Sequence, residues 1–296
     1  MKVLNFGSLN IDYVYKVDHF VEKGETISSR SLQIFTGGKG LNQSVALGRA
    51  GAEVYHAGCI GKDGAFLLDM LKSAGVDVSH VVELEEVRTG NAIIQNNVDG
   101  DNCIILYGGA NQQVTRKQVD QTLEYFSSGD YLILQNEINE LPYIVDRAHE
   151  KCMNIVLNPS PMNEKIQELA LEKIDWFLLN ELEASQITGV EASDTNRCIA
   201  ELRERFPDAR IVLTLGGDGS CYADREKIIT QKIYPVRTVD TTAAGDTFTG
   251  FFLASILQKK MVEEALDIAA RAAAIAVSRQ GAAPSIPTME EVEAWK

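Results

Sequence analysis

The sequence predicts an α/β protein whose doubly wound, mainly parallel sheet lies between two layers of helices and which carries a second, small β-sheet. Short apolar runs alternate with helical patterns along most of the 296 residues, which is the rhythm of a parallel sheet with helices on both faces. Residues 13–35 and 92–107 break this rhythm with paired β-segments. Hydrophobic residues make up 45% of the chain and charged residues 24%, so we expect a folded protein with one sizeable core.

The elements of the main domain follow in order from this alternation. Apolar runs bounded by polar or glycine positions predict strands at residues 3–7, 54–60, 131–135, 155–157, 176–179 and 211–215. Amphipathic or apolar patterns predict helices at residues 41–50, 62–74, 116–126, 141–151, 247–257 and 262–279. Thr115 and Gln118 predict a capping box for the helix at 116–126. Gly281 is expected to be the C-cap of the helix at 262–279.

The two regions outside the rhythm predict a small separate sheet. Residues 13–17 would pair with 32–35, and residues 92–98 with 103–107 across a turn at 99–102. These pairs do not fit a βαβ sequence, so we expect them to project over the ligand cleft. A small sheet alone leaves an apolar face uncovered, which predicts a homodimer formed through it.

Polar or glycine residues follow four successive predicted strands. They are Asn136 with Glu137, Asn158, Asn180, and Gly216 with Gly217. Open parallel sheets bind ligands outside the carboxyl ends of their strands, so these positions would line one cleft. Asparagine and glycine also favour the turns at strand exits, and this pattern alone leaves both interpretations open.

The segment DTTAAGD, from Asp240 to Asp246, precedes an apolar helix and places a carboxylate in its first turn. Helix N-termini attract anions through unpaired N–H groups and the macrodipole. The small residues before Asp246 therefore indicate a phosphate close to the backbone, and a hydroxyl beside Asp246 would complete a phosphoryl-transfer site. An aspartate before an apolar run more often only caps the helix, so this segment alone does not distinguish a catalytic aspartate from a capping one.

Three further segments carry a resemblance to a known family. They are GSLNID at residues 7–12, GGKGLNQ at 37–43 and GAAPS at 281–285. With DTTAAGD, and in this order over essentially the whole chain, they resemble the ribokinase branch of the ribokinase-like (phosphofructokinase-B type) sugar kinases. The resemblance implies that the small sheet is a lid. We expect residues 1–10, 42–88 and 109–296 to form the main nucleotide- and sugar-binding domain, and residues 11–41 and 89–108 to form the lid.

The resemblance implies roles for the sugar-binding and catalytic residues. The sugar hydroxyls would contact Asn10, Asp12, Gly38, Lys39, Asn42, Glu137 and Asp246. Asp12 would accept from two neighbouring hydroxyls. Asp246 would accept the proton of the primary hydroxyl as that hydroxyl attacks the γ-phosphoryl group of ATP. The backbone amides of Ala244, Gly245 and Asp246 would form an anion hole for the developing charge.

The nucleotide is not expected to bind a P-loop, because no G-x-x-x-x-G-K-[ST] pattern occurs. The resemblance implies that ATP contacts Asn180, Thr214, Gly216, Gly217, Gly219 and Gly245. Four alanines would let adenine approach a helix closely; they are Ala269, Ala270, Ala272 and Ala273. Asn180 and Glu183 match an N-x-x-E motif associated with Mg²⁺ and phosphate, in which Glu183 would act through water.

The resemblance also implies a monovalent cation beside the anion hole. Its ligands would be Asp240, the backbone of Thr242, the carbonyls of Ala276, Arg279 and Gly281, and Ser285. Hard oxygen ligands with one carboxylate suit an ion of the size of K⁺. We therefore expect activation by K⁺ over Na⁺.

Composition excludes several partners. The net charge is -14 and the basic residues are scattered, so a nucleic-acid partner is not expected. No apolar run reaches the roughly 18–20 residues that span a bilayer, and the N-terminus is typical of a strand rather than a signal peptide. Five widely spaced cysteines, an odd number without a C-x-x-C pair, predict a reducing, cytoplasmic location.

The acceptor sugar is the least determined feature. Ala243, where the wider family often has glycine, and Asn10 favour D-ribose, which would become ribose 5-phosphate. Residues 83–90 and 103–109 carry no pattern that sets the pocket, so deoxyribose, a ketohexose such as fructose, keto-deoxy-gluconate or a nucleoside remain alternatives. A noncatalytic sugar-binding regulator would not need the Asp246 motif. A Rossmann oxidoreductase would need a G-x-G-x-x-G motif that residues 3–10 lack.

Overall fold

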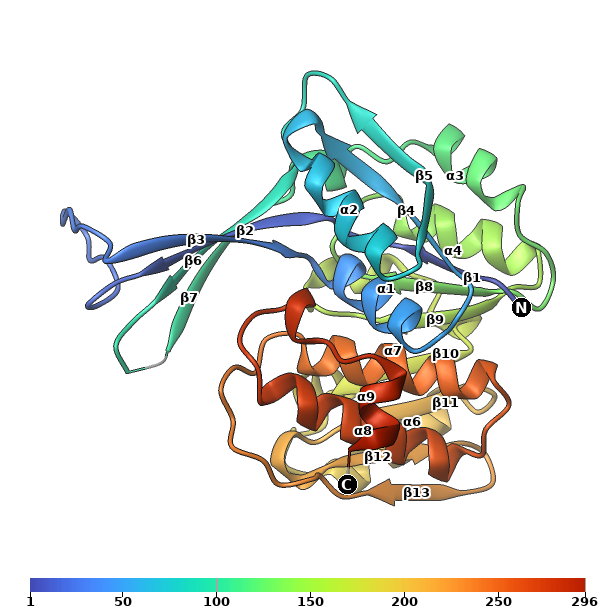
Figure 1. The fold of residues 1–296 in the computed structure, drawn as a ribbon. Coiled ribbons are helices and arrows are strands. Elements are labelled where there is room, and N and C mark those ends of the chain that lie inside the picture. The colour runs from blue at the N-terminus through green and yellow to red at the C-terminus, as the bar shows by residue number, and fades with distance from the viewer. Residues whose placement is uncertain (100, 296) are drawn as a thin grey trace.

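The computed structural model describes residues 1–99 and 101–295. Its main sheet has nine strands in the order β13-β12-β11-β10-β9-β8-β1-β4-β5 (Figure 1). From β5 to β11 every neighbouring pair is parallel, and β12 and β13 extend the sheet antiparallel. The strands are β1 (Val3–Phe6), β4 (Val54–Gly61), β5 (Asp77–Leu84), β8 (Tyr131–Gln135), β9 (Asn154–Asn158), β10 (Trp176–Asn180), β11 (Arg210–Thr214), β12 (Ser220–Ala223) and β13 (Ile228–Gln231).

Helices cover both faces of this sheet, because successive strand residues point to opposite faces and both sets are apolar. Val3 joins the hydrophobic cluster on one face, whereas Leu4 and Phe6 join the cluster on the other. The first cluster includes α1 (Lys39–Arg49), α2 (Ala65–Ser73), α7 (Ala244–Leu257), α8 (Val262–Val277) and α9 (Met289–Ala294). The second includes α3 (Arg116–Leu123), α4 (Leu141–Glu150), α5 (Glu181–Thr188) and α6 (Thr195–Arg205). The predicted three-layer α/β fold is confirmed.

The small sheet is separate from the main one and projects away from it (Figure 1). Its order is β3-β2-β6-β7, with β2 (Asn10–Lys16), β3 (Ser31–Gly37), β6 (Gly90–Asn96) and β7 (Asn102–Tyr107). The two predicted antiparallel pairs are present, and a parallel pairing of β2 with β6 joins them into one sheet. The turn predicted at 99–102 lies partly outside the described residues. The domain boundaries stay a prediction.

Several local expectations were wrong. Strands β5, β12 and β13 were not predicted, and α7 begins at Ala244, earlier than expected. Gly281 is not the C-cap of α8, because this helix ends at Val277 and is capped by Ser278. Only half of the capping box at α3 forms. The Thr115 side chain accepts from the Gln118 amide N–H, but the Gln118 side chain instead donates to the Gly58 carbonyl, at 2.9 Å.

None of the helices in residues 1–99 and 101–295 combines the length and the apolar character that crossing a bilayer requires.

Candidate active site

The carboxylate of Asp246 lies where α7 crosses α1. The two helices approach closely because Gly250 faces α1 without a side chain: a Cβ at Gly250 would lie 2.3 Å from the Cβ of Ala46. Asp246 is buried, and its Oδ2 accepts a hydrogen bond from Asn42 Nδ2 while its Oδ1 accepts one from Gln43 Nε2, both at 3.0 Å. Asp246 therefore bonds to the neighbouring helix and not to the start of its own. Simple helix capping does not describe it.

The first turn of α7 presents backbone amides beside this carboxylate. The helix starts after Ala243, which has the left-handed φ of 60° and provides no side-chain cap. The Ala244 amide donates to the Thr241 carbonyl at 3.2 Å. The amides of Gly245 and Asp246 have no acceptor in the described part of the chain. Two of the three predicted anion-hole donors are thus available to a ligand, at the end of the helix where the macrodipole is positive.

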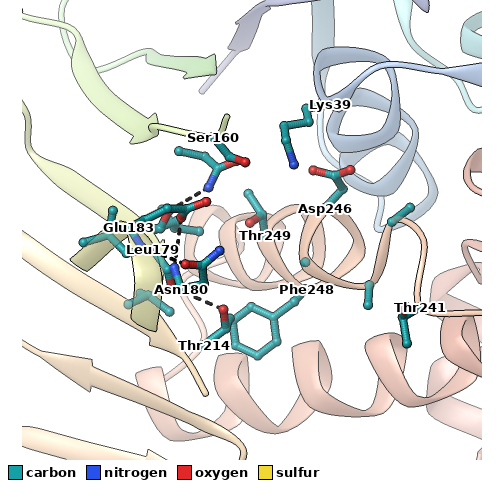
Figure 2. A pocket seen from close by; sticks show the side chains of 16 residues that line it. Lys39, Ser160, Leu179, Asn180, Glu183, Thr214, Thr241, Asp246, Phe248 and Thr249 are labelled. Carbon is teal, nitrogen blue, oxygen red and sulfur yellow. Dashed lines mark hydrogen bonds between the residues drawn. The ribbon is translucent and has the colours of Figure 1, made fainter. Parts of the chain in front are cut away.

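A polar hollow of about 260 Å³ opens in front of these amides. In Figure 2, the Lys39 side chain and the Asp246 carboxylate point toward each other across one end of it. The hollow is also lined by Asn158, Ser160, Leu178, Leu179, Asn180, Glu183, Val212, Thr214, Thr241, Phe248 and Thr249. The predicted strand-end residues Asn158 and Asn180 therefore do line one cleft.

Lys39 carries the positive charge of this hollow. Burial lowers the pKa of its ammonium group, but the nearby carboxylates of Asp246, Glu137 and Glu183 outweigh burial and raise that pKa. Lys39 is consequently charged at neutral pH. An ammonium group beside free helix amides is a suitable environment for the phosphates of a nucleotide in a protein of net charge -14.

Asn180 and Glu183 form a capping box at the start of α5. The Asn180 side chain accepts from the Glu183 amide at 2.8 Å, and the Asn180 amide donates to Glu183 Oε2 at 2.9 Å. Burial raises the pKa of the Glu183 carboxyl, and the bond from Asn180 opposes this rise. The N-x-x-E spacing therefore forms a helix cap, a structural role that was not predicted from the sequence. Both side chains also line the hollow.

The predicted sugar contacts lie next to this hollow, at the base of the small sheet. Asp12 is buried and its carboxylate has no hydrogen-bond donor among the described residues. Burial first, and then the charge of Glu137, raise the pKa of Asp12 to about 7. Glycine is required at position 37, where a Cβ would lie 2.0 Å from Asp12 Oδ2. A buried carboxylate left without donors fits a ligand that supplies hydroxyl groups.

Glu137 and Asn10 are already oriented by protein groups. Glu137 Oε2 accepts from the Ser8 hydroxyl and from the Lys39 amide, the latter at 2.9 Å. Burial raises the pKa of the Glu137 carboxyl. Asn10 Oδ1 accepts from Asn111 Nδ2 at 2.7 Å. The amide nitrogen of Asn10 therefore points away from Asn111, where it can donate to a ligand. Gly38 is the N-cap of α1 with φ 93°, a conformation that favours glycine.

A second, more apolar hollow of about 540 Å³ adjoins the first. Thr214, Thr241, Ala244, Gly245 and Phe248 line both, so the two hollows meet at the start of α7. The predicted loop glycines Gly216, Gly217 and Gly219 line the second hollow. A flat aromatic base fits there with its phosphates directed toward α7.

Of the four alanines predicted to lie beside adenine, only two line a hollow. Ala270 and Ala273 line the second hollow. Ala269 and Ala272 are fully buried in the core against α7. The expectation was wrong for these two because only one face of α8, with residues three or four apart, borders the hollow, and Ala269 and Ala272 lie on the neighbouring face that packs into the core.

The predicted cation residues gather between the start of α7 and the end of α8. Asp240 Oδ1 accepts from the Thr242 amide at 2.9 Å and hydroxyl at 2.6 Å, and its Oδ2 accepts from the Gly281 amide at 3.0 Å. Burial opposes ionisation, but these bonds outweigh it and lower the pKa of Asp240. The Ala276 carbonyl accepts from the Arg279 amide, and the Ser285 hydroxyl donates to the Ala282 carbonyl. An ionised carboxylate among carbonyl oxygens fits a monovalent cation.

No group of three or more His, Cys, Asp or Glu side chains that could hold a metal ion occurs in the described residues. A magnesium ion would therefore depend on nucleotide phosphates and water, with Glu183 as one of the two carboxylates, beside Asp246, that line the polar hollow.

Four side chains that support the site were not predicted from the sequence. Gln43 contacts Asp246, Ser8 contacts Glu137, Asn111 orients Asn10, and Ser160 lines the hollow beside Glu183. Gln43 could have been found, because it follows Asn42 within the glycine motif and lies one helical turn after Lys39. Ser8 and Ser160 lie in irregular segments and Asn111 lies in a short 3₁₀-helix at Gly109–Gln112, so no sequence period marks them.

Comparison with known proteins identifies the family. Residues 1–289 match the family model described as pfkB family carbohydrate kinase. The chain belongs to this family. It is 36% identical to a ribokinase of Haemophilus influenzae over 96% of this chain and 95% of that one. It is 33% identical to a ribokinase of Staphylococcus aureus over 98% of each chain, and 26% identical to a deoxyribokinase of Salmonella typhi over 98% of this chain and 97% of that one.

Solved structures give the same result. The Arabidopsis thaliana ribokinase complexed with ribose and ATP superposes with a TM-score of 0.88 at 30% identity, covering 99% of this chain and 97% of that one. The Cryptococcus neoformans ribokinase in complex with ADP superposes with a TM-score of 0.87 at 31% identity, covering 99% of each. A nucleoside kinase of Methanocaldococcus jannaschii, at 19% identity and a TM-score of 0.80, shares the fold. The family expected from the four motifs is confirmed.

Proposed function

We propose that this carbohydrate kinase transfers the γ-phosphate of ATP to the primary hydroxyl of D-ribose and releases ribose 5-phosphate and ADP. The observation that carries the proposal is the position of Asp246, whose buried carboxylate lies beside free helix amides where a polar and an apolar hollow meet. The similarity to ribokinases, such as the 36% identity to that of Haemophilus influenzae over 96% of this chain, supports ribose over deoxyribose or a nucleoside.

Different groups would bind the sugar, accept the proton and stabilise charge in the proposed reaction. Asp12 and Glu137 accept from sugar hydroxyls, and Asn10 donates to one. Asp246 accepts the proton of the attacking hydroxyl; because the transition state is loose, orienting this hydroxyl matters more than strong basicity. The amides of Gly245 and Asp246 stabilise charge on the transferring group.

Two metal ions complete the proposed chemistry. Mg²⁺ neutralises nucleotide phosphate charge when bound, and Glu183 would hold it through water. K⁺ would be held by Asp240, the Thr242 backbone and the carbonyls at the end of α8, where it would keep the start of α7 in place. The lowered pKa of Asp240 supports this role, because the carboxylate is ionised over the whole neutral range.

A homodimer formed through the small sheet is part of the proposal. Tyr13, Ile34, Ile93 and Ile105 pair across the four strands. Ile34, Ile93 and Ile105 are exposed in the single chain. Such an apolar row supports association with a second copy. The cytoplasmic location stays a prediction.

The test is ADP release measured across ribose, deoxyribose, fructose, keto-deoxy-gluconate and nucleosides, with Mg²⁺ and either K⁺ or Na⁺. We expect ribose to give the highest kcat/KM, and K⁺ to give a higher rate than Na⁺. If another acceptor gave a higher kcat/KM, that acceptor and not ribose would be assigned as the substrate. Equal rates in the two salts would count against the cation site.

A further inference from the structure

A line of buried amide side chains leads from the main sheet to Asp246. Asn5 lies on β1, Gln135 on β8 and Gln43 on α1, and each is at most 1% exposed. None of them reaches the polar hollow, and the proposed chemistry does not use them. Burying three amides is costly unless their hydrogen bonds are made, so their arrangement calls for an explanation.

Backbone carbonyls determine which way each amide points. The Gly40 carbonyl can only accept, so Asn5 must turn Nδ2 toward it, at 2.8 Å. Asn5 Oδ1 then faces Gln135 and accepts from its Nε2 at 3.0 Å. The same Nε2 donates to Gln43 Oε1 at 2.7 Å. The carbonyl of the Gln43 side chain consequently faces the sheet, and its NH₂ group faces away from it.

A second set of contacts requires the same orientation. Gln43 Nε2 donates to Asp246 Oδ1 at 3.0 Å and to Asn158 Oδ1 at 3.2 Å. Asn158 must present this oxygen, because its Nδ2 donates to the backbone carbonyl of Leu178 at 2.9 Å. If the Gln43 amide were inverted, its oxygen would face two other oxygens. Gln43 therefore has a single favourable orientation that is specified from both sides.

This arrangement leaves one polar atom unsatisfied. Gln135 Oε1 is buried without a hydrogen-bond partner among the described residues. A buried acceptor left unpaired costs about 1–3 kcal/mol. An apolar residue at position 135 would avoid that cost but would leave the Gln43 carbonyl without its donor.

We propose that Gln43 is a positioning residue, held in one orientation by Gln135 and Asn5, that fixes the carboxylate of Asp246 toward the sugar hydroxyl. The inference rests on the proposed function. Asn42 donates to Oδ2 and Gln43 donates to Oδ1, so rotation of the carboxylate would break both hydrogen bonds. Misplacing a reacting group by about 1 Å can cost a hundredfold in rate.

The first test replaces Gln43 by a residue of similar length without an amide. For Gln43→Met we expect kcat to fall about 10- to 100-fold, while the KM values for ribose and ATP change little. The matched control is Gln118→Met, which removes a buried glutamine that donates to the Gly58 carbonyl and does not contact Asp246. It should lower thermal stability to a similar extent and leave kcat unchanged. Gln43→Met with kcat within twofold of the wild type would overturn the proposal.

Two further variants test the directed contact rather than packing. Gln135→Met does not touch Asp246, yet we expect it to lower kcat, because the Gln43 amide loses the donor that orients it. In the Asp246→Asn background, Gln43→Met should cause no further loss, since both act through one carboxylate. Losses that multiply in the double variant would show that Gln43 acts independently and would overturn the proposal.

Gln43→Glu separates the positioning role from a folding defect, because it preserves the size of the side chain. The introduced carboxyl group donates to Asp246 only while protonated, so kcat should fall as pH rises relative to the wild type. The other charged groups that face Asp246 are Lys39, Glu137 and Glu183, and they are the same in both proteins. A parallel pH profile would contradict the positioning role.

Failure of this inference can be told apart from failure of the proposed function. If the wild type releases ADP with a sugar and Asp246→Asn does not, while Gln43→Met behaves like Gln118→Met, only the positioning role is wrong. If the wild type releases no ADP with any sugar or nucleoside, both are wrong.

Discussion

At the scale of single residues, Asp12 shows how ligand binding conflicts with stability. Its folded-state pKa of about 7 lies above the ordinary value of 3.8. Folding therefore favours the protonated carboxyl, and stability is lost as pH rises from about 4 to 7, where the folded protein must ionise a buried group. The full penalty for a shift of this size is roughly 4 kcal/mol at most.

We predict that Asp12→Asn stabilises the protein in the absence of ligand and abolishes ribose binding. At pH 8 the melting temperature of the variant should exceed that of the wild type, and this difference should shrink as the pH falls toward 4, because the folded wild-type carboxyl is then protonated and no longer carries a buried charge. Differential scanning calorimetry over this range measures the effect. Asp208→Asn, at a side chain 94% exposed, serves as a control without effect. A variant that melts lower than the wild type at pH 8 would contradict the assigned environment.

At the scale of elements, the close packing of α1 against α7 determines the geometry of the site. Gly250 permits this crossing, since a Cβ there would lie 2.3 Å from the Ala46 Cβ and 2.8 Å from the Leu47 amide nitrogen. Both neighbours belong to α1 and neither can move without shifting that helix. The distance between the helices in turn sets the bonds from Asn42 and Gln43 to Asp246.

We predict that Gly250→Ala destabilises the protein by about 1–3 kcal/mol and lowers kcat, although alanine favours helices more than glycine. Chemical denaturation and steady-state kinetics measure the two effects. Ser255→Ala, on the same helix, is the control: within the described residues its buried hydroxyl has no partner, so its removal should cost no stability. A Gly250→Ala protein as stable and as active as the wild type would show that the helices are not in close contact.

The elements also show what could be predicted from the sequence. Strands β1, β8 and β10 and helix α4 were predicted to within a residue or two, because their apolar patterns are local. The start of α7 was missed, because the left-handed Ala243 depends on the tertiary position of the segment. Strands β12 and β13 were missed because their patterns, SCYA and IITQ, do not stand out from the surrounding sequence.

The candidate site, too, could be predicted only in part from the sequence. Motif residues such as Asp12, Asn42 and Asp246 could be assigned by resemblance. The partners that orient them could not, because Asn111 and Gln135 lie about 100 residues away in the chain from the groups that they contact. Such contacts arise only when the sheet assembles.

At the scale of the whole molecule, the small sheet exposes apolar side chains to solvent. All six residues of β7 are exposed, among them Ile104, Ile105 and Leu106. Exposed apolar surface of this kind is typical of a site of association with another molecule.

We predict that the protein sediments as a dimer at micromolar concentration and that Ile105→Lys makes it a monomer, because a charge in the apolar row prevents its burial. Analytical ultracentrifugation measures this. Met261→Lys changes an equally exposed residue at the start of α8, outside the small sheet, and should leave the dimer intact. A monomeric wild type would remove the proposal.

In the proposed reaction Asp246 orients and deprotonates the sugar hydroxyl, and Asp246→Asn removes the carboxylate that does so. The variant should bind ribose and ATP with nearly the wild-type affinity in calorimetric titrations, because asparagine has the same shape. Its kcat for ADP release in the presence of ribose should fall on the order of 10³-fold. Near-normal turnover in this variant, with ribose bound, would contradict the account.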